Sequence, residues 1–205
     1  MPDPIADAPL VRIVDDQLPV REAVADLLAS VGLAARGYAS VAAFRQEDDP
    51  ARPGCIVLDV RMPGSSGFDL LATMTAEGEG LPVVFVTGHG DIPMAVRAIK
   101  AGAVDFLAKP FNDQQLIDAV NAAIREDGVR RTTRNIAADA ARRLSTLSEG
   151  EYEVLRLTVE GLRVKQIASR LTISEITVKT RRARLMQKLE ATTLLDLLRL
   201  FDKGR

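Results

Sequence analysis

One apolar run that ends on an aspartate constrains the fold of this chain more than any other feature. Residues 56–58, Ile-Val-Leu, lead directly into Asp59 with no polar residue between them. Such a run is typical of a strand that is buried on both faces of a parallel sheet. Met-Pro-Gly at residues 62–64 cannot continue a strand, so Asp59 is expected at the carboxyl end of a central strand. In open α/β sheets, ligands bind in the crevice outside these strand ends.

The first 124 residues alternate short apolar runs with segments of helical periodicity. The expected strands cover about residues 10–14, 34–38, 56–59, 82–86 and 104–108. The expected helices follow them, at about residues 18–31, 40–46, 67–77, 93–101 and 112–124. Strict alternation of strand and helix predicts an α/β unit, a five-stranded parallel sheet with helices on both faces.

Polar side chains stand at the ends of four of these strands. Asp15 and Asp16 follow the first strand, and Asp59 ends the third. Thr87 follows the fourth strand, and Lys109 follows the fifth. The carboxyl ends of parallel strands lie along one edge of a sheet, so these side chains are expected to converge. Each of them alone would be interpreted as a turn residue, a cap or a surface charge, but together they predict a site.

The residue types at this edge indicate a particular chemistry. Three neighbouring carboxylates repel one another unless a cation lies between them, and oxygen ligands favour a hard ion such as Mg²⁺. Such an ion would also neutralise an incoming phosphoryl group. We therefore predict that Asp59 is the nucleophile that forms an acyl phosphate. Lys109 would pair with one phosphate oxygen, and Thr87 would donate a hydrogen bond to another.

The strand ends also carry recognisable motifs. These are Val-Asp-Asp at residues 14–16, Leu-Asp-Val-Arg-Met-Pro at 58–63, Val-Thr-Gly at 86–88 and Lys-Pro-Phe at 109–111. With these motifs, residues 9–124 resemble the receiver domain of two-component response regulators, and residues 87–103 resemble its FixJ-type subgroup. The resemblance implies a flavodoxin-like fold, and it implies that a partner histidine kinase phosphorylates Asp59.

The resemblance further implies which residues hold the ion and which respond to the phosphate. The implied Mg²⁺ ligands are Asp16, Asp59 and the backbone carbonyl of Arg61, with Asp15 helping to hold the ion through water. Lys109 would precede a cis peptide bond. Thr87 would move toward the phosphate while Phe106 turns inward, although Phe106 can also be interpreted as an ordinary core residue. Phenylalanine has no hydroxyl group, so a bias toward the inward form is expected. The helix at 93–101 and the strand at 104–108 would form the surface of a homodimer.

Charge is distributed unevenly along the chain. Residues 1–124 hold 9 basic and 17 acidic residues, whereas residues 125–144 hold 6 and 3, and residues 145–205 hold 12 and 8. An acidic first part and a basic end suggest a regulatory module joined to one that meets an anionic partner. The single cysteine, Cys55, cannot form an internal disulfide, which fits a reducing compartment. No signal peptide or bilayer-spanning run is visible, so we expect a cytoplasmic protein without membrane contact.

Residues 125–144 are rich in arginine and alanine and poor in large apolar side chains. Val129 and Ile136 mark a thin helical stripe, so we predict a helical linker. Two interpretations stay open, namely a solvated linker helix or a helix that pairs with its copy in a dimer. Gly128 argues against one unbroken helix from residue 112 onward, because glycine costs about 1 kcal/mol relative to alanine within a helix.

Residues 145–205 are predicted to be helical throughout. A capping box, Ser-Glu-Gly-Glu at residues 148–151, opens the first of four helices. A short helix at 164–171, a tight turn and a capped helix at 174–189 are the parts of a helix-turn-helix. A final helix covers about residues 193–201. The third helix carries a cationic face suited to phosphates and base edges, with a solvated charged surface as the alternative interpretation.

About residues 145–200 resemble the LuxR-type DNA-binding domain. The motifs are Leu-Ser-Glu-Gly-Glu at residues 147–151, Lys-Gln-Ile-Ala at 165–168, Ile-Ser at 173–174 and Thr-Val-Lys at 177–179. Gly150, Val164 and Arg181 depart from the family pattern, which we expect to shift affinity or target sequence but not the class of ligand. The predicted DNA contacts are Lys165, Thr177, Lys179, Arg181, Arg182 and Lys188.

The sequence thus predicts a receiver domain (1–124), a linker (125–144) and a DNA-binding domain (145–205). Its function would be transcriptional regulation rather than catalysis. Phosphorylation of Asp59 would promote dimerisation and binding to double-stranded promoter DNA, with activation as the expected direction and RNA polymerase as a further partner. Two other classes stay open. A small phosphatase would need a second carboxylate two residues after the nucleophile, where Arg61 stands. A scaffold with phosphate-independent DNA binding would bind DNA equally with and without a phosphodonor.

Overall fold

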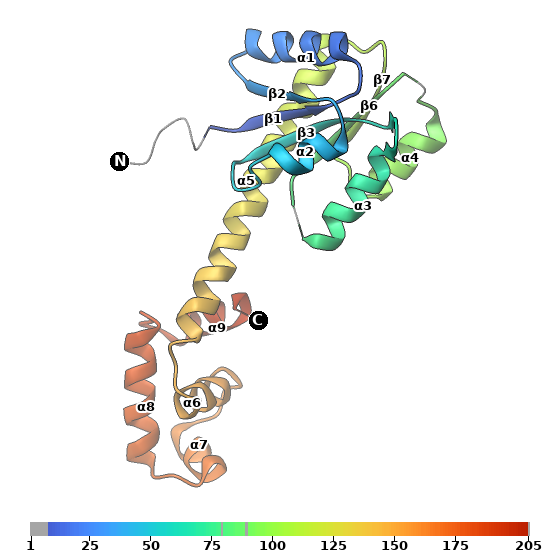
Figure 1. The fold of residues 1–205 in the computed structure, drawn as a ribbon. Helices are drawn as coiled ribbons and strands as arrows, with labels where there is room; N and C mark the ends of the chain where they lie inside the picture. Colours follow the sequence, from blue (N-terminus) through green and yellow to red (C-terminus); the bar gives the residue numbers. More distant parts are fainter. Residues whose placement is uncertain (1–7, 79, 89, 205) are drawn as a thin grey trace. The chain divides into compact units, whose positions relative to one another are not determined.

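The computed structural model describes residues 8–78, 80–88 and 90–204, and the chain divides into two compact units between residues 130 and 131 (Figure 1). The first unit contains a five-stranded sheet, in which neighbouring strands run parallel in the order β2–β1–β3–β6–β7. These strands are β1 (Leu10–Val14), β2 (Ala34–Tyr38), β3 (Gly54–Asp59), β6 (Val83–Thr87) and β7 (Asp105–Ala108). The predicted fold class is confirmed for this unit.

Helices cover both faces of the sheet (Figure 1). They are α1 (Leu18–Ser30), α2 (Val41–Glu47), α3 (Gly67–Glu77), α4 (Ile92–Lys100) and α5 (Asp113–Leu144). On one face, Leu28 of α1 and Leu116 of α5 belong to the same buried cluster as Val57 of β3. On the other face, side chains of α2, α3 and α4 pack in a second cluster with Phe85 of β6. The unbroken apolar runs within β3 and β6 follow from this burial on two sides.

A small hairpin that the sequence did not predict follows β3. The strands β4 (Arg61–Met62) and β5 (Ser65–Ser66) pair antiparallel around a Pro-Gly loop. Gly64 has a φ of 82°, which glycine adopts without steric cost, and proline is favoured at the preceding position of such a turn. Met-Pro-Gly therefore ends the central strand, as predicted, and also reverses the chain beside the carboxyl end of β3.

Arg12 lies in the middle of β1, and its side chain is fully buried. Its Nε donates to both carboxylate oxygens of Asp48, at 2.8 and 2.9 Å. Its terminal nitrogens donate to the backbone carbonyls of Leu10, Asp49, Arg52 and Pro53. The hydroxyl of Tyr38 donates to the same carboxylate at 3.0 Å, and burial together with this bond raises the pKa of Tyr38 to about 12. The guanidinium thus ties β1 to the segment between α2 and β3.

The expectation that Gly128 interrupts the linker helix was wrong, because α5 is one continuous helix from Asp113 to Leu144. Contacts on both sides of the glycine hold the helix. The carboxylate of Asp127 is buried and accepts a 2.8 Å hydrogen bond from the backbone N–H of Gly54. Arg130 donates to the carbonyl of Gly80 at 3.3 Å. These contacts offset the modest cost of about 1 kcal/mol that a glycine imposes on a helix.

The second unit is helical, as predicted, and contains the end of α5 together with α6 (Glu149–Val159), α7 (Val164–Leu171), α8 (Glu175–Lys188) and α9 (Leu194–Lys203). Its core joins all four of the last helices, and its fully buried side chains include Leu155 of α6, Ile167 of α7 and Leu185 of α8. Among the described residues, no helix combines the length and the apolar character that crossing a membrane requires.

Glu151 links the first helix of this unit to α8. Its carboxylate accepts a 2.9 Å hydrogen bond from the backbone N–H of Ser148 and so completes the predicted capping box. The ammonium of Lys188 donates to the same oxygen at 2.6 Å and to the carbonyl of Thr146 at 3.0 Å. Lys188, together with the Ser148 amide, lowers the pKa of Glu151 below its usual value of 4.5.

Replacing Glu151 with glutamine is expected to lower the free energy of unfolding of the second unit by about 1–2 kcal/mol at pH 7, because two hydrogen bonds lose their ionised acceptor. A carboxyl with a lowered pKa stabilises the fold above its unfolded pKa, and this contribution is lost as the pH falls through the folded pKa. The difference in Tm between the two proteins is therefore expected to be constant near neutral pH and to shrink below about pH 4.5. A difference that persists unchanged at pH 3 would contradict this role.

Candidate functional site

Three aspartates meet at the carboxyl edge of the sheet. Asp15 follows β1 and Asp59 ends β3, and these strands are parallel neighbours with Val14 opposite Leu58. Asp16 is the next residue along the chain from Asp15. Each aspartate offers one carboxylate oxygen, and these oxygens lie within 4.8 Å of one another. Asp15 and Asp59 are buried, whereas Asp16 is exposed, so the cluster opens to solvent on one side.

Lys109 and Thr87 lie at the ends of the next strands along the same edge. The ammonium of Lys109 donates to Asp15 at 2.7 Å, with Asp15 rather than Asp59 as its ion-pair partner. The backbone N–H of Lys109 donates to the carbonyl of Thr87 at 2.7 Å, which places the lysine beside the end of β6. Thr87 is buried, and the Lys109–Pro110 peptide bond is cis, as the family resemblance implies.

Asp59 has the most unusual environment of the three carboxylates. Burial raises its pKa, the charge of Lys109 lowers it, and the charge of Asp15 raises it again. The backbone N–H groups of Val60 and Arg61 also lower its pKa. One of its oxygens, Oδ1, is buried and has no hydrogen-bond partner among the described residues. A buried carboxylate oxygen of this kind indicates a missing positive or hydrogen-bonding partner.

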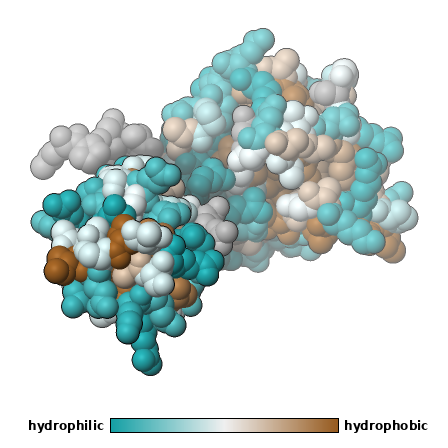
Figure 2. All heavy atoms as spheres, turned by 90° about the horizontal axis from the view of Figure 1, so that it is seen from below, coloured by the Kyte–Doolittle hydropathy of each residue, from teal (hydrophilic) through white to brown (hydrophobic). Residues whose placement is uncertain are grey.

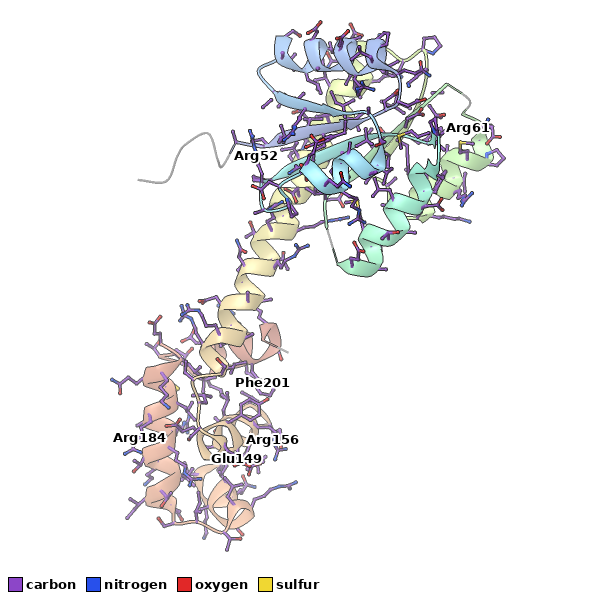
Figure 3. The ribbon with its side chains drawn as sticks, viewed as in Figure 1. Arg52, Arg61, Glu149, Arg156, Arg184 and Phe201 are labelled. Carbon is purple, nitrogen blue, oxygen red and sulfur yellow. The ribbon has the colours of Figure 1, made fainter. Side chains whose placement is uncertain are left out.

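These residues fit a magnesium ion. All three side chains supply oxygen, the donor type that Mg²⁺ prefers, and their mutual repulsion would be relieved by a divalent cation. Arg61 begins β4 directly after this cluster, and Figure 3 shows it at the same edge of the sheet. The predicted use of its carbonyl as a ligand stays a prediction.

The predicted switch residue Phe106 is half-buried in β7 and packs against the core cluster of α2, α3 and α4. Its ring lies against the loop before α4, since a Cβ built on Gly90 would be only 2.9 Å from it. On α4 itself, Ile92, Val96 and Ile99 recur at helical spacing, and they are 81%, 48% and 51% exposed. The predicted dimer surface therefore presents an apolar stripe.

In the second unit, α8 carries most of the predicted DNA contacts. Val178 and Leu185 of α8 are fully buried, so the opposite side of the helix faces solvent. Lys179 is exposed on α8 and Lys165 is exposed on α7, whereas Arg182 is half-buried. Figure 2 views the helical unit from the end where α7 and α8 meet, and its surface there is largely hydrophilic with isolated hydrophobic spots.

Other predicted contacts have partners within the unit. Lys188 is held by Glu151, and the hydroxyl of Thr177 lies 2.8 Å from that of Ser174, the N-cap of α8. Arg181 lies over the start of α6, where a Cβ on Gly150 would be 2.6 Å from its guanidinium. The roles of these three residues toward DNA stay predictions.

Arg184 belongs to the cations of this helix but is not among the predicted DNA contacts, although it is exposed on α8 (Figure 3). Counting 100° per residue from the buried stripe would have placed it on the outer surface.

Comparisons with known proteins match one family to part of each unit. Residues 11–121 match the response regulator receiver domain, and residues 145–201 match the bacterial regulatory proteins of the luxR family. The C4-dicarboxylate transport transcriptional regulatory protein DctR of Rhodobacter capsulatus is 46% identical over 192 residues, which are 93% of this chain and 98% of that protein. The transcriptional regulatory protein FixJ of Azorhizobium caulinodans is 44% identical over 190 residues, which are 93% and 90% of the two chains.

A solved structure of a response regulator is also similar to this chain over nearly its whole length. A low-resolution structure of the response regulator StyR is 44% identical to this chain. The similarity covers 96% of this chain and 99% of that one, with a TM-score of 0.85.

Proposed function

The chain belongs to the response regulators that join a receiver domain to a LuxR-type DNA-binding domain, and from this premise we propose that a phosphoryl group on Asp59 controls its binding to promoter DNA. The observation that carries the proposal is the edge of the sheet, where a buried Asp59 with an unengaged oxygen lies beside two more carboxylates and near Lys109. Regulation of transcription by such a chain requires a kinase and DNA as partners.

Each residue at this edge has its own role in phosphoryl transfer. An oxygen of the Asp59 carboxylate attacks the phosphorus atom of the donor, the bond between phosphorus and its leaving group breaks, and that group departs with the bonding electrons. Lys109 leaves Asp15 in part to pair with a phosphoryl oxygen, and the Thr87 hydroxyl donates to another. Asp15, Asp16, Asp59 and the Arg61 carbonyl would hold Mg²⁺. When bound, the ion neutralises charge on the phosphoryl group.

The histidine kinase needs a surface beside the acceptor. An apolar groove of about 550 Å³ lies between α1 and the start of α5, and its lining includes Val20 and Leu27 of α1 and Phe111. Lys109 and Pro110 line the same groove, so a protein seated there would be next to the acidic edge. We assign this groove to the kinase.

The phosphorylated chain forms a homodimer through α4 and β7. The stripe of Ile92, Val96 and Ile99 is apolar and exposed, and its burial between two chains would favour dimerisation through the hydrophobic effect. Two receiver domains paired in this way would bring two DNA-binding domains to a two-fold operator. The dimer would act in the cytoplasm. Its binding is expected to activate transcription, with RNA polymerase as its partner at the promoter.

A single charge on this stripe is expected to prevent dimerisation. The variant Ile99→Glu should remain monomeric with a small phosphodonor and Mg²⁺ present, whereas the wild-type chain should become dimeric, because the carboxylate would be buried unpaired in the interface. Sedimentation at several protein concentrations measures the difference. Val129→Glu, on the 68% exposed Val129 of α5, is the matched control. If Val129→Glu blocks dimerisation and Ile99→Glu does not, the linker helix and not α4 forms the dimer.

The function is tested by selection from genomic DNA. Fragments are incubated with the chain in the presence of a phosphodonor and Mg²⁺, and the bound fragments are sequenced. We expect enrichment of a common sequence with two related half-sites spaced by about one helical turn or a multiple of it. Bound fragments that share no sequence would contradict a promoter-specific regulator.

A further inference from the structure

The first turn of α8 exposes a large apolar side chain. Ile176 is 76% exposed, although Val178 and Leu185 of the same helix are fully buried. Within α8, all of which the structure describes, Ile176 is the one exposed large hydrophobic residue. The packing of the helical unit therefore gives no reason for an isoleucine at this position.

Ile176 lies at the start of an uncharged strip along α8. The strip continues with Thr180, Ala183 and Gln187, which recur at intervals of four, three and four residues and are all exposed. This spacing puts them on one face, opposite the buried stripe. The hydroxyl of Thr180 donates to the carbonyl of Ile176 at 2.9 Å, so it is engaged with the helix itself.

Cations flank this strip on both sides. Lys179 and Arg184 are exposed, and at 100° per residue they lie on opposite sides of the line from Ile176 to Gln187. This is the arrangement that a helix in the major groove requires, with cations toward the two phosphate backbones and short or apolar side chains toward the bases. The N-terminal residues of such a helix reach the base edges.

The major groove offers one apolar group, the 5-methyl group of thymine. We propose that Ile176 contacts this methyl group and is a residue that determines which DNA sequence the chain binds. The inference rests on the proposed DNA-binding function and names the base edge that α8 reads. A protein partner fits the position less well, because a protein interface needs a contiguous apolar patch, whereas Ile176 is a single apolar side chain between cations.

Deoxyuridine differs from thymidine only in lacking the 5-methyl group, and it provides the test. Each thymine of a selected fragment is replaced singly by deoxyuridine, and Kd is measured at one salt concentration for the wild-type chain and for Ile176→Ala. At one thymine in each half-site, the replacement should weaken wild-type binding about fourfold, the effect of losing one buried methyl contact. The same replacement should leave the Kd of Ile176→Ala unchanged.

Ile136→Ala is the matched control, because it removes the same atoms from a 43% exposed isoleucine on α5. It should respond to deoxyuridine as the wild-type chain does. If every replacement affects the wild-type chain and Ile176→Ala equally, the inference is overturned while sequence-specific binding stands. A wild-type chain that binds all fragments with equal affinity would overturn the inference together with the proposed function.

Discussion

Replacing Asp59 with alanine is expected to abolish the incorporation of phosphate from a small phosphodonor such as acetyl phosphate in the presence of Mg²⁺. The reason lies in the arrangement of the three aspartates. Asp15 is already paired with Lys109, and Asp16 is exposed, whereas Asp59 is buried with an unengaged oxygen. The incorporated phosphoryl group is measured by intact-protein mass spectrometry.

The control for this experiment is Asp26→Ala, which removes an exposed carboxylate from α1. It should leave the incorporation of phosphate at the wild-type level. Unchanged labelling of Asp59→Ala would refute the assignment of Asp59 as the acceptor, because another side chain would then carry the phosphoryl group.

Replacing Asp48 with alanine is expected to lower the free energy of unfolding of the receiver domain by about 3–5 kcal/mol, the effect of leaving a buried charge without its partner. The side chain of Arg12 is fully buried, and that of Asp48 is only 6% exposed. Four backbone carbonyls and Tyr38 depend on the same network, so the guanidinium cannot reach water without disturbing the segment between α2 and β3. Denaturant unfolding measures the change.

Two further variants separate the buried pair from ordinary surface charge. The exposed pair of Arg36 and Glu47 joins the same part of the fold at 2.9 Å, with side chains 50% and 55% exposed. Glu47→Ala should therefore cost less than about 1 kcal/mol. The double variant Arg12→Met and Asp48→Leu should recover only part of the loss, because it removes the unpaired charge but leaves the four carbonyls and the Tyr38 hydroxyl without these partners. Equal effects of Asp48→Ala and Glu47→Ala would show that the network adds little stability.

The sheet and the acidic edge were predictable because their signals are local. An apolar run, a breaking residue and a polar residue at the strand end identify each strand from a few neighbours along the chain. Parallel topology then brings the strand ends together without further information. For this reason Asp15 and Asp59 could be placed at one edge, although they are far apart in the sequence.

Features that depend on distant partners could not be predicted. Arg12 interrupts an apolar strand, and nothing near it in the sequence indicates that Asp48 completes its environment. Gly128 was expected to interrupt the helix because its sequence neighbours do not reveal the contact between Asp127 and Gly54. These two residues lie 73 positions apart in the sequence. Local propensity is a weak prior that such tertiary contacts override.

The side of α8 that is predicted to face DNA could not be derived from local sequence either. Arg181 was predicted to contact DNA because of its charge. In the structure its guanidinium lies over Gly150 at the start of α6. Both residues depart from the family pattern, but they lie 31 positions apart, and no local pattern indicates that they touch. Conversely, Ile176 carries no charge and was passed over, although it is the most exposed large hydrophobic residue of the second unit among those described.

One titration shows whether the phosphoryl group on Asp59 controls DNA binding. The Kd for a selected fragment is measured at fixed salt with the wild-type chain, with and without acetyl phosphate and Mg²⁺. Coupling between two sites of about 1–3 kcal/mol changes affinity roughly 5- to 150-fold, so we expect the phosphorylated chain to bind at least about fivefold more tightly. Equal Kd values for a chain whose phosphorylation is verified by mass would show that the phosphoryl group on Asp59 does not control DNA binding.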